Sequence, residues 1–251
     1  MSRLAVVSPH LDDAVLSAWL VLAGTTNALV ISCFAGVPQG TVEGAWDAKT
    51  KFSSATEALA ARRREDVAAL ATTQSRAVHL DLLDEQYRAD QDAPGDELTA
   101  LLQTHLADAE EVWLPAGLGC HTDHLLTRDA ALAATSRTGQ RLRLYADLPY
   151  AGQPAWPAEV TGGARDRARR YLLSALRRPT PTQEWRSTLA DAGLDRRLGA
   201  RTVSKLDHRE LRSKLHAIRH YTSQLEALGC GPKHPLRVRR IFGYEVHWPI
   251  G

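Results

Sequence analysis

Cysteine is scarce in this sequence. Three of the 251 residues are cysteines, at positions 33, 120 and 230. An odd and sparse set provides no disulfide framework of the kind that small secreted proteins use, and it is typical of a reducing compartment. We therefore expect a cytoplasmic protein that is held together by its hydrophobic core.

Long apolar runs and an excess of one charge are also missing. No stretch approaches the roughly 20 apolar residues that a membrane-spanning helix requires, and the first residues do not have the layout of a signal peptide. The 31 lysine and arginine residues are nearly balanced by 29 aspartate and glutamate residues, which leaves a formal net charge of +2. We therefore expect neither a membrane nor a nucleic acid as partner.

The sequence does contain a regular alternation of strand-like and helix-like segments. Short apolar runs occupy residues 4–7, 28–34, 77–83, 112–114 and 142–145. Helix-like segments lie between them, at residues 12–22, 54–71, 96–109 and 123–134. This alternation predicts an α/β fold with a Rossmann-like, mostly parallel sheet that carries helices on both faces.

The last third of the chain is less regular. Prolines and glycines interrupt it near residues 154–163 and 179–181, and the pattern predicts a basic helix over 165–176, a long helix over 207–228 and a β-prone tail over 237–248. No internal repeat separates a second domain. We expect a single domain over residues 1–251, in which residues 1–150 form the α/β core and residues 151–251 form an extension that packs on it.

The first candidate site follows the first strand-like run, where segment 9–13 reads PHLDD. Parallel sheets bind ligands outside the carboxyl ends of their strands. His10, Asp12 and Asp13 offer imidazole and carboxylate ligands for zinc, and one carboxylate can bind metal while the other stays free as a base. An aspartate at a helix start also serves as a helix cap that needs no metal. The spacing alone leaves these two interpretations open.

The second candidate site follows another strand-like run, where segment 115–124 reads PAGLGCHTDH. It places His121, Asp123 and His124 after two glycines. Because both segments leave the carboxyl ends of strands, a parallel sheet can bring them together. Jointly they supply enough nitrogen and oxygen ligands for a catalytic metal site, which needs three protein ligands and one open position.

In order and context, the two segments resemble the LmbE-like, or PIG-L, family of zinc-dependent N-deacetylases. The usual motifs of that family are A-H-P-D-D-E and, much later, H-x-D-H or H-x-x-H. Weaker matches support the resemblance: RRRE at 62–65, HLDLLD at 79–84, YADLPY at 145–150, and a late helix that carries Lys214 and YTSQ at 221–224. Leu11 stands where the family has proline, and Ala14 where it has glutamate.

The resemblance implies a ligand set and a base. His10, Asp13 and His124 would bind zinc, and iron(II) suits the same ligands. Asp12 would be the general base.

The resemblance also implies roles for four further residues. A positively charged His121 would polarise the amide carbonyl and stabilise the oxyanion, or would assist the leaving amine, and Asp123 would orient His121. Arg62 and Asp84 would contact the hydroxyl groups or charges of the substrate.

The implied function is that of a metal-dependent hydrolase, which removes an N-acyl group, first of all N-acetyl, from an amino sugar or glycoconjugate by zinc-activated water. One alternative is an amidase or deacylase that acts on a non-sugar metabolite. Another is a non-catalytic, metal-containing module that binds a carbohydrate or nucleotide. Metal binding alone needs neither Asp12 nor His121, so their presence favours an enzyme. The sequence leaves homo-oligomerisation open.

Several other side chains admit a functional interpretation. His216 and His220 are four residues apart but lack the glutamate of H-E-x-x-H, so we expect a solvated helix face. We expect Cys120 to be a small buried residue. Four tryptophans lie in loop-like or terminal regions: Trp46, Trp156, Trp185 and Trp248. Each of them either stacks on a sugar or packs in the core.

Overall fold

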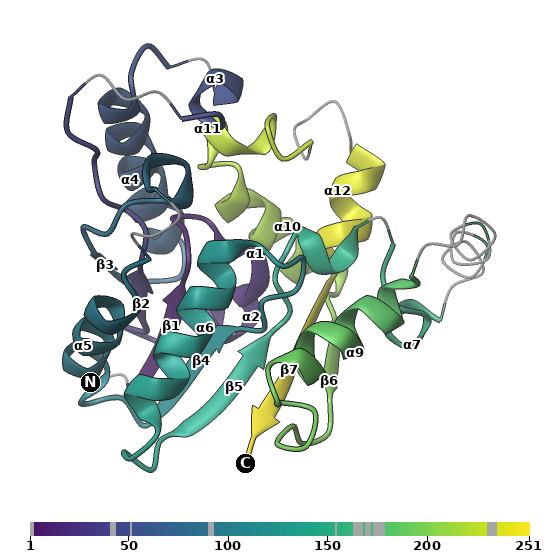
Figure 1. Cartoon of the computed structure of the whole chain (residues 1–251). Helices are drawn as coiled ribbons and strands as arrows, with labels where there is room; N and C mark the ends of the chain where they lie inside the picture. Colours follow the sequence, from purple (N-terminus) through teal and green to yellow (C-terminus); the bar gives the residue numbers. More distant parts are fainter. Residues whose placement is uncertain are drawn as a thin grey trace.

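The computed structural model describes residues 3–40, 44–50, 52–89, 93–153, 155–162, 168, 172, 179–229 and 235–251. In these residues one sheet has the strand order β3-β2-β1-β4-β5-β7-β6 (Figure 1). Its strands are β1 (Leu4–Ser8), β2 (Leu29–Ser32), β3 (Arg76–His79), β4 (Glu111–Pro115), β5 (Arg141–Tyr145), β6 (Thr202–Lys205) and β7 (Tyr244–Ile250). The first five pair in parallel, β7 is antiparallel to β5, and β6 is antiparallel to β7. The predicted mostly parallel α/β sheet is confirmed.

The helices are distributed over both faces of the sheet. They are α1 (Asp13–Ser17), α2 (Trp19–Ala23), α3 (Asp47–Thr50), α4 (Ala55–Ala71), α5 (Gly95–Leu106), α6 (Thr122–Thr135), α7 (Ala158–Thr161), α9 (Pro181–Asp191), α10 (His208–Ile218), α11 (Thr222–Leu225) and α12 (Pro235–Phe242), with the 3₁₀ turns η1 (Glu85–Tyr87) and η2 (Tyr150–Gly152). From β1 the chain adds β2 and β3 on one side, then β4 and β5 on the other. Because parallel crossovers are right-handed, helices α1, α2 and α4 cover one face and α5 and α6 the other (Figure 1).

The strand order reverses between β1 and β4, which pair directly. Such a reversal leaves a crevice at the carboxyl ends of the two strands, where α/β proteins bind ligands. β1 is buried along its whole length and ends at Ser8. The Ser8 hydroxyl donates to the backbone carbonyl of His10 over 2.7 Å and accepts from the Ala14 N–H over 3.0 Å. This pair of bonds folds segment 9–13 back over the end of the strand.

The helix expected over residues 12–22 is interrupted. α1 and α2 meet at Ala18, whose backbone is not helical. Two long-range hydrogen bonds flank the break: the Ser17 hydroxyl accepts from the Leu148 N–H over 2.9 Å, and the Glu245 carboxylate accepts from the Leu20 N–H over 3.0 Å. Partners from distant parts of the chain therefore end one short helix and begin the next.

The long helix expected over residues 207–228 is also divided, into α10 and α11. The Tyr221 hydroxyl donates to Asp66 over 2.9 Å. The Thr222 hydroxyl and the Ser223 N–H both donate to Glu65, over 2.7 and 2.9 Å. These contacts attach the chain to α4 and turn it away from the axis of α10.

The expectation of a β-prone tail over residues 237–248 is wrong for its first half. Residues through Phe242 belong to α12, and β7 begins at Tyr244. Val238, Ile241 and Phe242 recur at helical spacing, whereas alternation typical of a strand begins only after Gly243. A Cβ atom at Gly243 would lie 2.6 Å from the Arg239 carbonyl oxygen, so the transition requires glycine.

Besides α12, three elements of the last third were not expected, namely α7, α9 and β6. α9 starts at Pro181, behind a capping box in which Thr180 and Gln183 bond reciprocally. This proline therefore begins a helix instead of breaking the chain. The basic helix expected over 165–176 lies outside the described residues, apart from residues 168 and 172. Within the described part, no helix is long and apolar enough to cross a membrane.

Candidate active site

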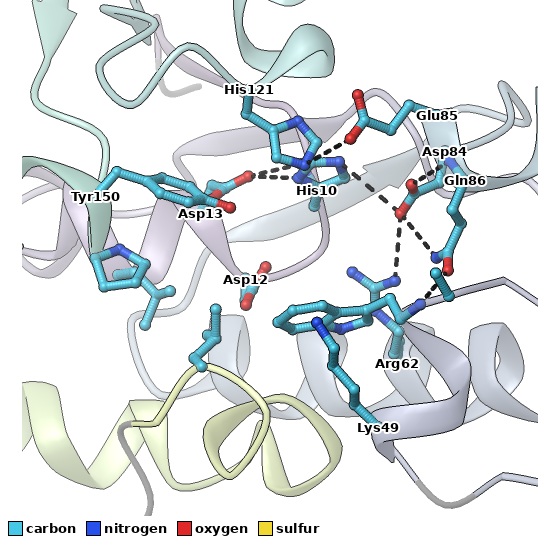
Figure 2. A pocket seen from close by; sticks show the side chains of 15 residues that line it. His10, Asp12, Asp13, Lys49, Arg62, Asp84, Glu85, Gln86, His121 and Tyr150 are labelled. Carbon is cyan, nitrogen blue, oxygen red and sulfur yellow. Dashed lines mark hydrogen bonds and ion pairs between the residues drawn. The ribbon is translucent and has the colours of Figure 1, made fainter.

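The two predicted segments meet in one pocket at the carboxyl ends of β1 and β4 (Figure 2). The pocket has a volume of about 260 Å³. Its walls include six of the predicted site residues, namely His10, Asp12, Asp13, Arg62, Asp84 and His121. The other two, Asp123 and His124, are fully buried behind them in α6.

His10, Asp13 and His124 bring one ligand atom each to within 4.8 Å of one another. The Asp13 Oδ2 atom lies 3.2 Å from His10 Nδ1 and 3.3 Å from His124 Nε2. All three side chains are buried. Two imidazole nitrogens and a carboxylate oxygen are a donor set that zinc and iron(II) both accept.

The surroundings of His124 fit a metal at this point. Its Nδ1 atom donates to Asp147 Oδ1 over 2.7 Å, and Asp147 Oδ2 accepts from the Leu118 N–H over 2.8 Å. This bond holds the proton of the neutral ring on Nδ1, so Nε2 is the nitrogen that faces the proposed metal position. Among the described residues, His124 Nε2 is a buried atom with no hydrogen-bond partner. Because a buried polar atom is rarely left without a partner, this nitrogen is suited to coordinate a cation.

The electrostatics of the cluster favour positive charge. Burial lowers the pKa of His124, but Asp13 and Asp147 outweigh it and raise this pKa to about 9. For His10 as well, burial is outweighed by Asp123 and Asp13, and the pKa lies well above its usual value. Two buried histidines that retain protons in this way occupy a site where a divalent cation can replace the protons.

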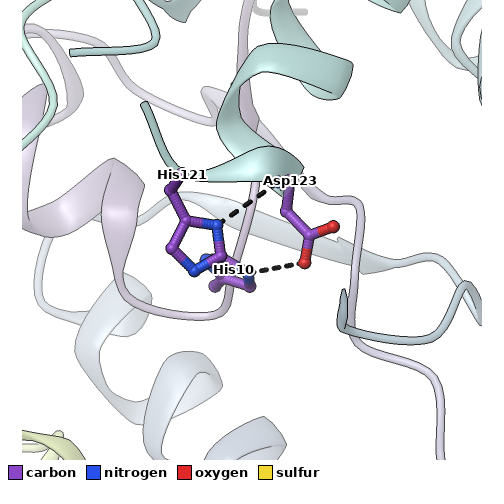
Figure 3. Close-up of side chains that lie close together, drawn as sticks. All are labelled: His10, His121 and Asp123. Atoms are coloured by element: carbon purple, nitrogen blue, oxygen red, sulfur yellow. Dashed lines mark hydrogen bonds and ion pairs between the residues drawn. The ribbon is translucent and has the colours of Figure 1, made fainter. Parts of the chain in front are cut away.

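The carboxylate of Asp123 bonds to His10 and not to His121, which accepts from the Asp123 backbone N–H instead (Figure 3). Its Oδ2 atom accepts from His10 Nε2 and from the Glu85 N–H, both over 3.0 Å, and its Oδ1 atom accepts from Arg88 over 2.5 Å. Burial raises the pKa of Asp123, but the bonds from His10 and Arg88 hold it at about 2. The expected pairing with His121 is therefore replaced by a carboxylate–histidine contact of the kind that orients metal ligands.

His121 is held in a different way from the one expected. It caps α6, since its Nδ1 atom accepts from the Asp123 N–H over 3.3 Å. The proton of the neutral ring is then on Nε2, which lies 3.4 Å from Glu85 Oε1. Burial and the neighbouring His10 and His124 lower the pKa of His121. The neutral imidazole is thus favoured over the positively charged ring, and it still presents an N–H donor to the pocket.

Asp12 is not a helix cap. It occupies the position before α1, but its side chain makes no capping hydrogen bond. No hydrogen bond or ion pair joins its carboxylate to the other pocket residues in Figure 2. Burial and the adjacent Asp13 raise the pKa of Asp12 to about 6. Asp12 is therefore a buried carboxylate in the pocket wall with a strengthened affinity for protons.

His10, His121 and Asp123 form a second group whose ligand atoms lie close enough for a metal. It is less suited to the task, because the Asp123 carboxylate already accepts hydrogen bonds from Arg88, Glu85 and His10. Coordination of a metal by this second group would break some of these hydrogen bonds. In the group with His124, the Nε2 atom of that histidine has no hydrogen-bond partner among the described residues.

Residues 5–135, more than half of the chain, match the family described as PIG-L, GlcNAc-PI de-N-acetylase. The chain belongs to the PIG-L family. It is similar to the 2'-N-acetylparomamine deacetylase of Streptomyces fradiae, with 27% identity over 170 residues, which are 60% of this chain and 58% of that relative. The match thus spans less than two thirds of the relative.

Two solved structures resemble the whole chain of this PIG-L protein. One is a triple mutant of a deacetylase of the teicoplanin biosynthetic pathway, with a TM-score of 0.73, 29% identity, and coverage of 100% of this chain and 98% of the other. The other is a zinc-inhibited form of the teicoplanin deacetylase, with a TM-score of 0.68, 25% identity, and coverage of 99% and 97%.

Arg62 and Asp84 of this PIG-L protein, which belong to the RRRE and HLDLLD matches, lie together. The Arg62 Nη1 atom is 3.6 Å from Asp84 Oδ2, and both side chains are buried in the pocket wall. Asp84 also accepts from the Gln86 N–H over 3.2 Å. Arg62 Nε and Nη1 are buried atoms with no hydrogen-bond partner among the described residues.

Four residues at the site of this PIG-L protein were given no role from the sequence, and two of them, Glu85 and Tyr150, line the pocket. Asp147 and Tyr150 belong to the YADLPY match, which marked the element but not the contacts. The ring of Tyr150 stands perpendicular to that of His124, with 5.4 Å between centroids. Glu85 and Arg88 lie in and after η1, where no sequence pattern distinguishes them from other surface charges.

The solvent exposure of side chains tests two further expectations, one for Cys120 and one for the histidines near the end of α10. Cys120 is exposed and not buried, because the loop turns outward there with a φ of 56°. Gly119 beside it has a φ of 93°, and a Cβ atom at that position would lie 2.6 Å from the Tyr150 Cβ atom. His216 is exposed on α10, as predicted for a solvated helix face, whereas His220 lies beyond the end of α10 and is partly buried.

Proposed function

We propose that this protein is a metal-dependent hydrolase that removes an N-acyl group, N-acetyl in the simplest case, from an amino sugar or its glycoconjugate. One observation carries the proposal. His10, Asp13 and His124 form a buried group, in which His124 Nε2 has no hydrogen-bond partner among the described residues. The adjoining pocket wall contains Asp12 and His121, two polar side chains that metal binding would not use.

His10, Asp13 and His124 would hold the cation, which we propose to be zinc. A divalent cation in such a site supplies Lewis acidity, which polarises an amide carbonyl and lowers the pKa of water. Asp147 and Asp123 would keep the two histidine rings in position through their second ring nitrogens.

Asp12 is the proposed general base. Its carboxylate makes no capping hydrogen bond to α1, and burial and the adjacent Asp13 raise its pKa to about 6. A carboxylate with this pKa accepts a proton from water more readily than an ordinary aspartate and can then pass it to the leaving amine. The water oxygen forms a bond to the carbonyl carbon and the C–N bond breaks, so that with these two proton transfers the amide and water give an amine and a carboxylic acid.

His121 is the proposed oxyanion donor. Its Nδ1 atom is occupied by the Asp123 N–H, so Nε2–H faces the pocket as a donor. A donor fixed in advance stabilises the negative charge that develops on the carbonyl oxygen of the amide. The capping bond to α6 provides that fixation, without the need for a positive charge on the ring.

The proposed substrate class comes from the relatives and from the pocket wall. The similar proteins are deacetylases of paromamine and teicoplanin pathways. Arg62 and Asp84 place buried donors and acceptors beside the catalytic groups, which suits the hydroxyl groups of a sugar.

The direct test is a hydrolysis assay with the metal-loaded protein. The panel contains N-acetylglucosamine, its methyl glycoside, 2'-N-acetylparomamine and an N-acetylated teicoplanin pseudoaglycone, with N-acetylethanolamine as a linear amide. Zinc is supplied at one equivalent and in excess, since a similar deacetylase has a zinc-inhibited form. We expect acetate and free amine in equal amounts from at least one sugar. Absence of acetate from all sugars, with the metal content confirmed, would refute the proposal.

A further inference from the structure

The four tryptophans of uncertain role fall into two groups. Trp156, Trp185 and Trp248 are buried and contact one another edge to face, with ring centroids 6.0 and 5.6 Å apart. They belong to the core. Trp46 is only partly buried and lines the pocket that contains the proposed catalytic groups.

Two glutamines from distant parts of the chain hold Trp46 in place. Its indole N–H donates to Gln224 Oε1 over 2.8 Å, and its backbone N–H donates to Gln86 Oε1 over 3.0 Å. Gln224 belongs to α11 and is almost fully buried, whereas Gln86 belongs to η1. The indole is therefore fixed at its polar edge, and Lys49 Nζ lies over the ring.

The element that carries Gln224 is itself anchored. Glu65 of α4 accepts hydrogen bonds from the Thr222 hydroxyl, the Ser223 N–H and the Ser223 hydroxyl, over 2.7, 2.9 and 2.6 Å. This anchoring gives a physical reason for the RRRE and YTSQ matches. Glu65 fixes α11, and Gln224 of α11 fixes the indole of Trp46, so the aromatic surface exists before any ligand arrives.

Polar groups surround the indole. Lys49 Nζ lies 4.9 Å from the centroid of the Trp46 ring, and Figure 2 shows the side chains of Lys49 and Arg62 pointing into the same region of the pocket. The Arg62 Nη1 atom of this region lies 3.6 Å from Asp84 Oδ2. An aromatic plane beside a paired guanidinium and carboxylate matches a sugar ring, which has apolar C–H faces and a rim of hydroxyl groups. A linear acyl amide offers no such face.

The formal charges of the lining favour a neutral ring. The pocket wall contains four carboxylates, Asp12, Asp13, Asp84 and Glu85, and two cations, Lys49 and Arg62. A divalent metal ion would balance the excess of negative charge. A phosphate or carboxylate on the sugar would therefore add an uncompensated negative charge.

We infer that Trp46 is a specificity-determining residue of this site, and that its indole stacks on an uncharged pyranose ring of the substrate. The inference rests on the proposed function, since it names the part of the glycoconjugate that the pocket recognises.

The test measures binding and does not depend on turnover. The metal-loaded D12N protein is titrated by calorimetry with the methyl glycoside of N-acetylglucosamine. Trp46→Ala in this background should raise Kd about tenfold, because an aromatic contact contributes on the order of 1 kcal/mol beyond the area it buries. Trp46→Phe, which keeps an aromatic face but loses the bond to Gln224, should raise Kd by a smaller factor. Trp113→Phe, outside the pocket, is the matched control.

Each outcome decides the inference. An unchanged Kd in the Trp46→Ala protein, or no binding of the glycoside to the D12N protein, would overturn it. Tighter binding of N-acetylglucosamine 6-phosphate than of the neutral glycoside would overturn the claim about charge. Failure of the proposed function has a different signature, in which the sugar binds through Trp46 but the wild-type protein releases no acetate.

Discussion

The two adjacent aspartates after β1 differ in what their carboxylates touch. Asp13 lies between His10 and His124 at 3.2 and 3.3 Å, so its charge is used by the proposed ligand group. Asp12 has no such partner and makes no capping bond. The surroundings of these two adjacent aspartates therefore favour different proposed roles, metal binding for Asp13 and proton transfer for Asp12.

Replacement of Asp12 by asparagine should separate catalysis from metal binding. The change removes a base but no ligand, so we expect activity to fall about 10² to 10⁴-fold, the usual contribution of a general base, while metal content stays at one ion per chain. Zinc stoichiometry and single-turnover rates are measured on the same preparation. Asp96→Asn on the exposed side of α5 is the control. Near wild-type turnover in Asp12→Asn would rule out the proposed base.

Replacement of His121 by alanine tests the proposed oxyanion donor. The capping bond occupies Nδ1, so Nε2–H is the ring donor on the pocket side, 3.4 Å from Glu85 Oε1. We expect kcat to fall about 10² to 10³-fold, as for the loss of one oxyanion donor, with metal affinity retained. Loss of metal in step with loss of activity would instead place His121 in the coordination sphere.

The short turn η1 organises both histidines that face the pocket. The Glu85 N–H and the Arg88 side chain hold Asp123, which in turn holds His10, and the Glu85 carboxylate lies 3.4 Å from His121. Arg88 also donates to the Leu83 carbonyl and lies over the Phe34 ring, 4.7 Å from its centroid. At the proposed metal site, metal affinity would therefore depend on an element that supplies no ligand.

Arg88→Met should weaken zinc binding about 10 to 100-fold, the usual effect of losing a group that orients a metal ligand. Competition with a chromophoric chelator measures the affinity directly and needs no substrate. Arg88→Lys, which keeps a positive charge near Asp123, should recover part of the loss. The exposed Arg64→Met on α4 serves as control. Equal affinities in wild type and Arg88→Met would show that Asp123 positions His10 without help from Arg88.

The sequence predicted the elements that neighbouring residues define, and it failed for features that depend on contacts with residues distant in the chain. The parallel strands, α4 and the PHLDD and HTDH loops follow from apolar runs and strand exits, which neighbouring residues define. The break between α10 and α11 depends on Asp66 and Glu65, about 150 residues earlier. The partner of Asp123 was misjudged for the same reason, since Arg88 comes from a loop that no periodicity marks.

The C-terminal strand β7 joins the sheet and also contacts α2, the helix that follows the first site segment. β7 pairs with β5, and Glu245 of β7 accepts from the buried Lys214 of α10 over 2.6 Å. The other Glu245 oxygen accepts from the Leu20 N–H at the start of α2. A single buried carboxylate therefore connects three elements, one of which directly follows the α1 helix that begins at Asp13.

Lys214→Met should destabilise the whole protein. The change leaves Glu245 buried without its cation, and breaking a buried pair in this way costs about 3–5 kcal/mol. We expect the urea midpoint to fall accordingly, whereas Lys205→Met on the exposed side of β6 should have little effect. An unchanged midpoint for Lys214→Met would mean that the ion pair contributes nothing to folding.

The central claim is that one cation is held by His10, Asp13 and His124, while Asp12 and His121 stay free for catalysis. The most direct measurement is an anomalous-difference map of zinc-loaded crystals at the zinc edge. The account predicts one peak per chain, about 2.0–2.2 Å from an imidazole nitrogen of His10 and of His124 and from a carboxylate oxygen of Asp13. A peak among His10, His121 and Asp123 instead, or no peak in this pocket, would contradict it.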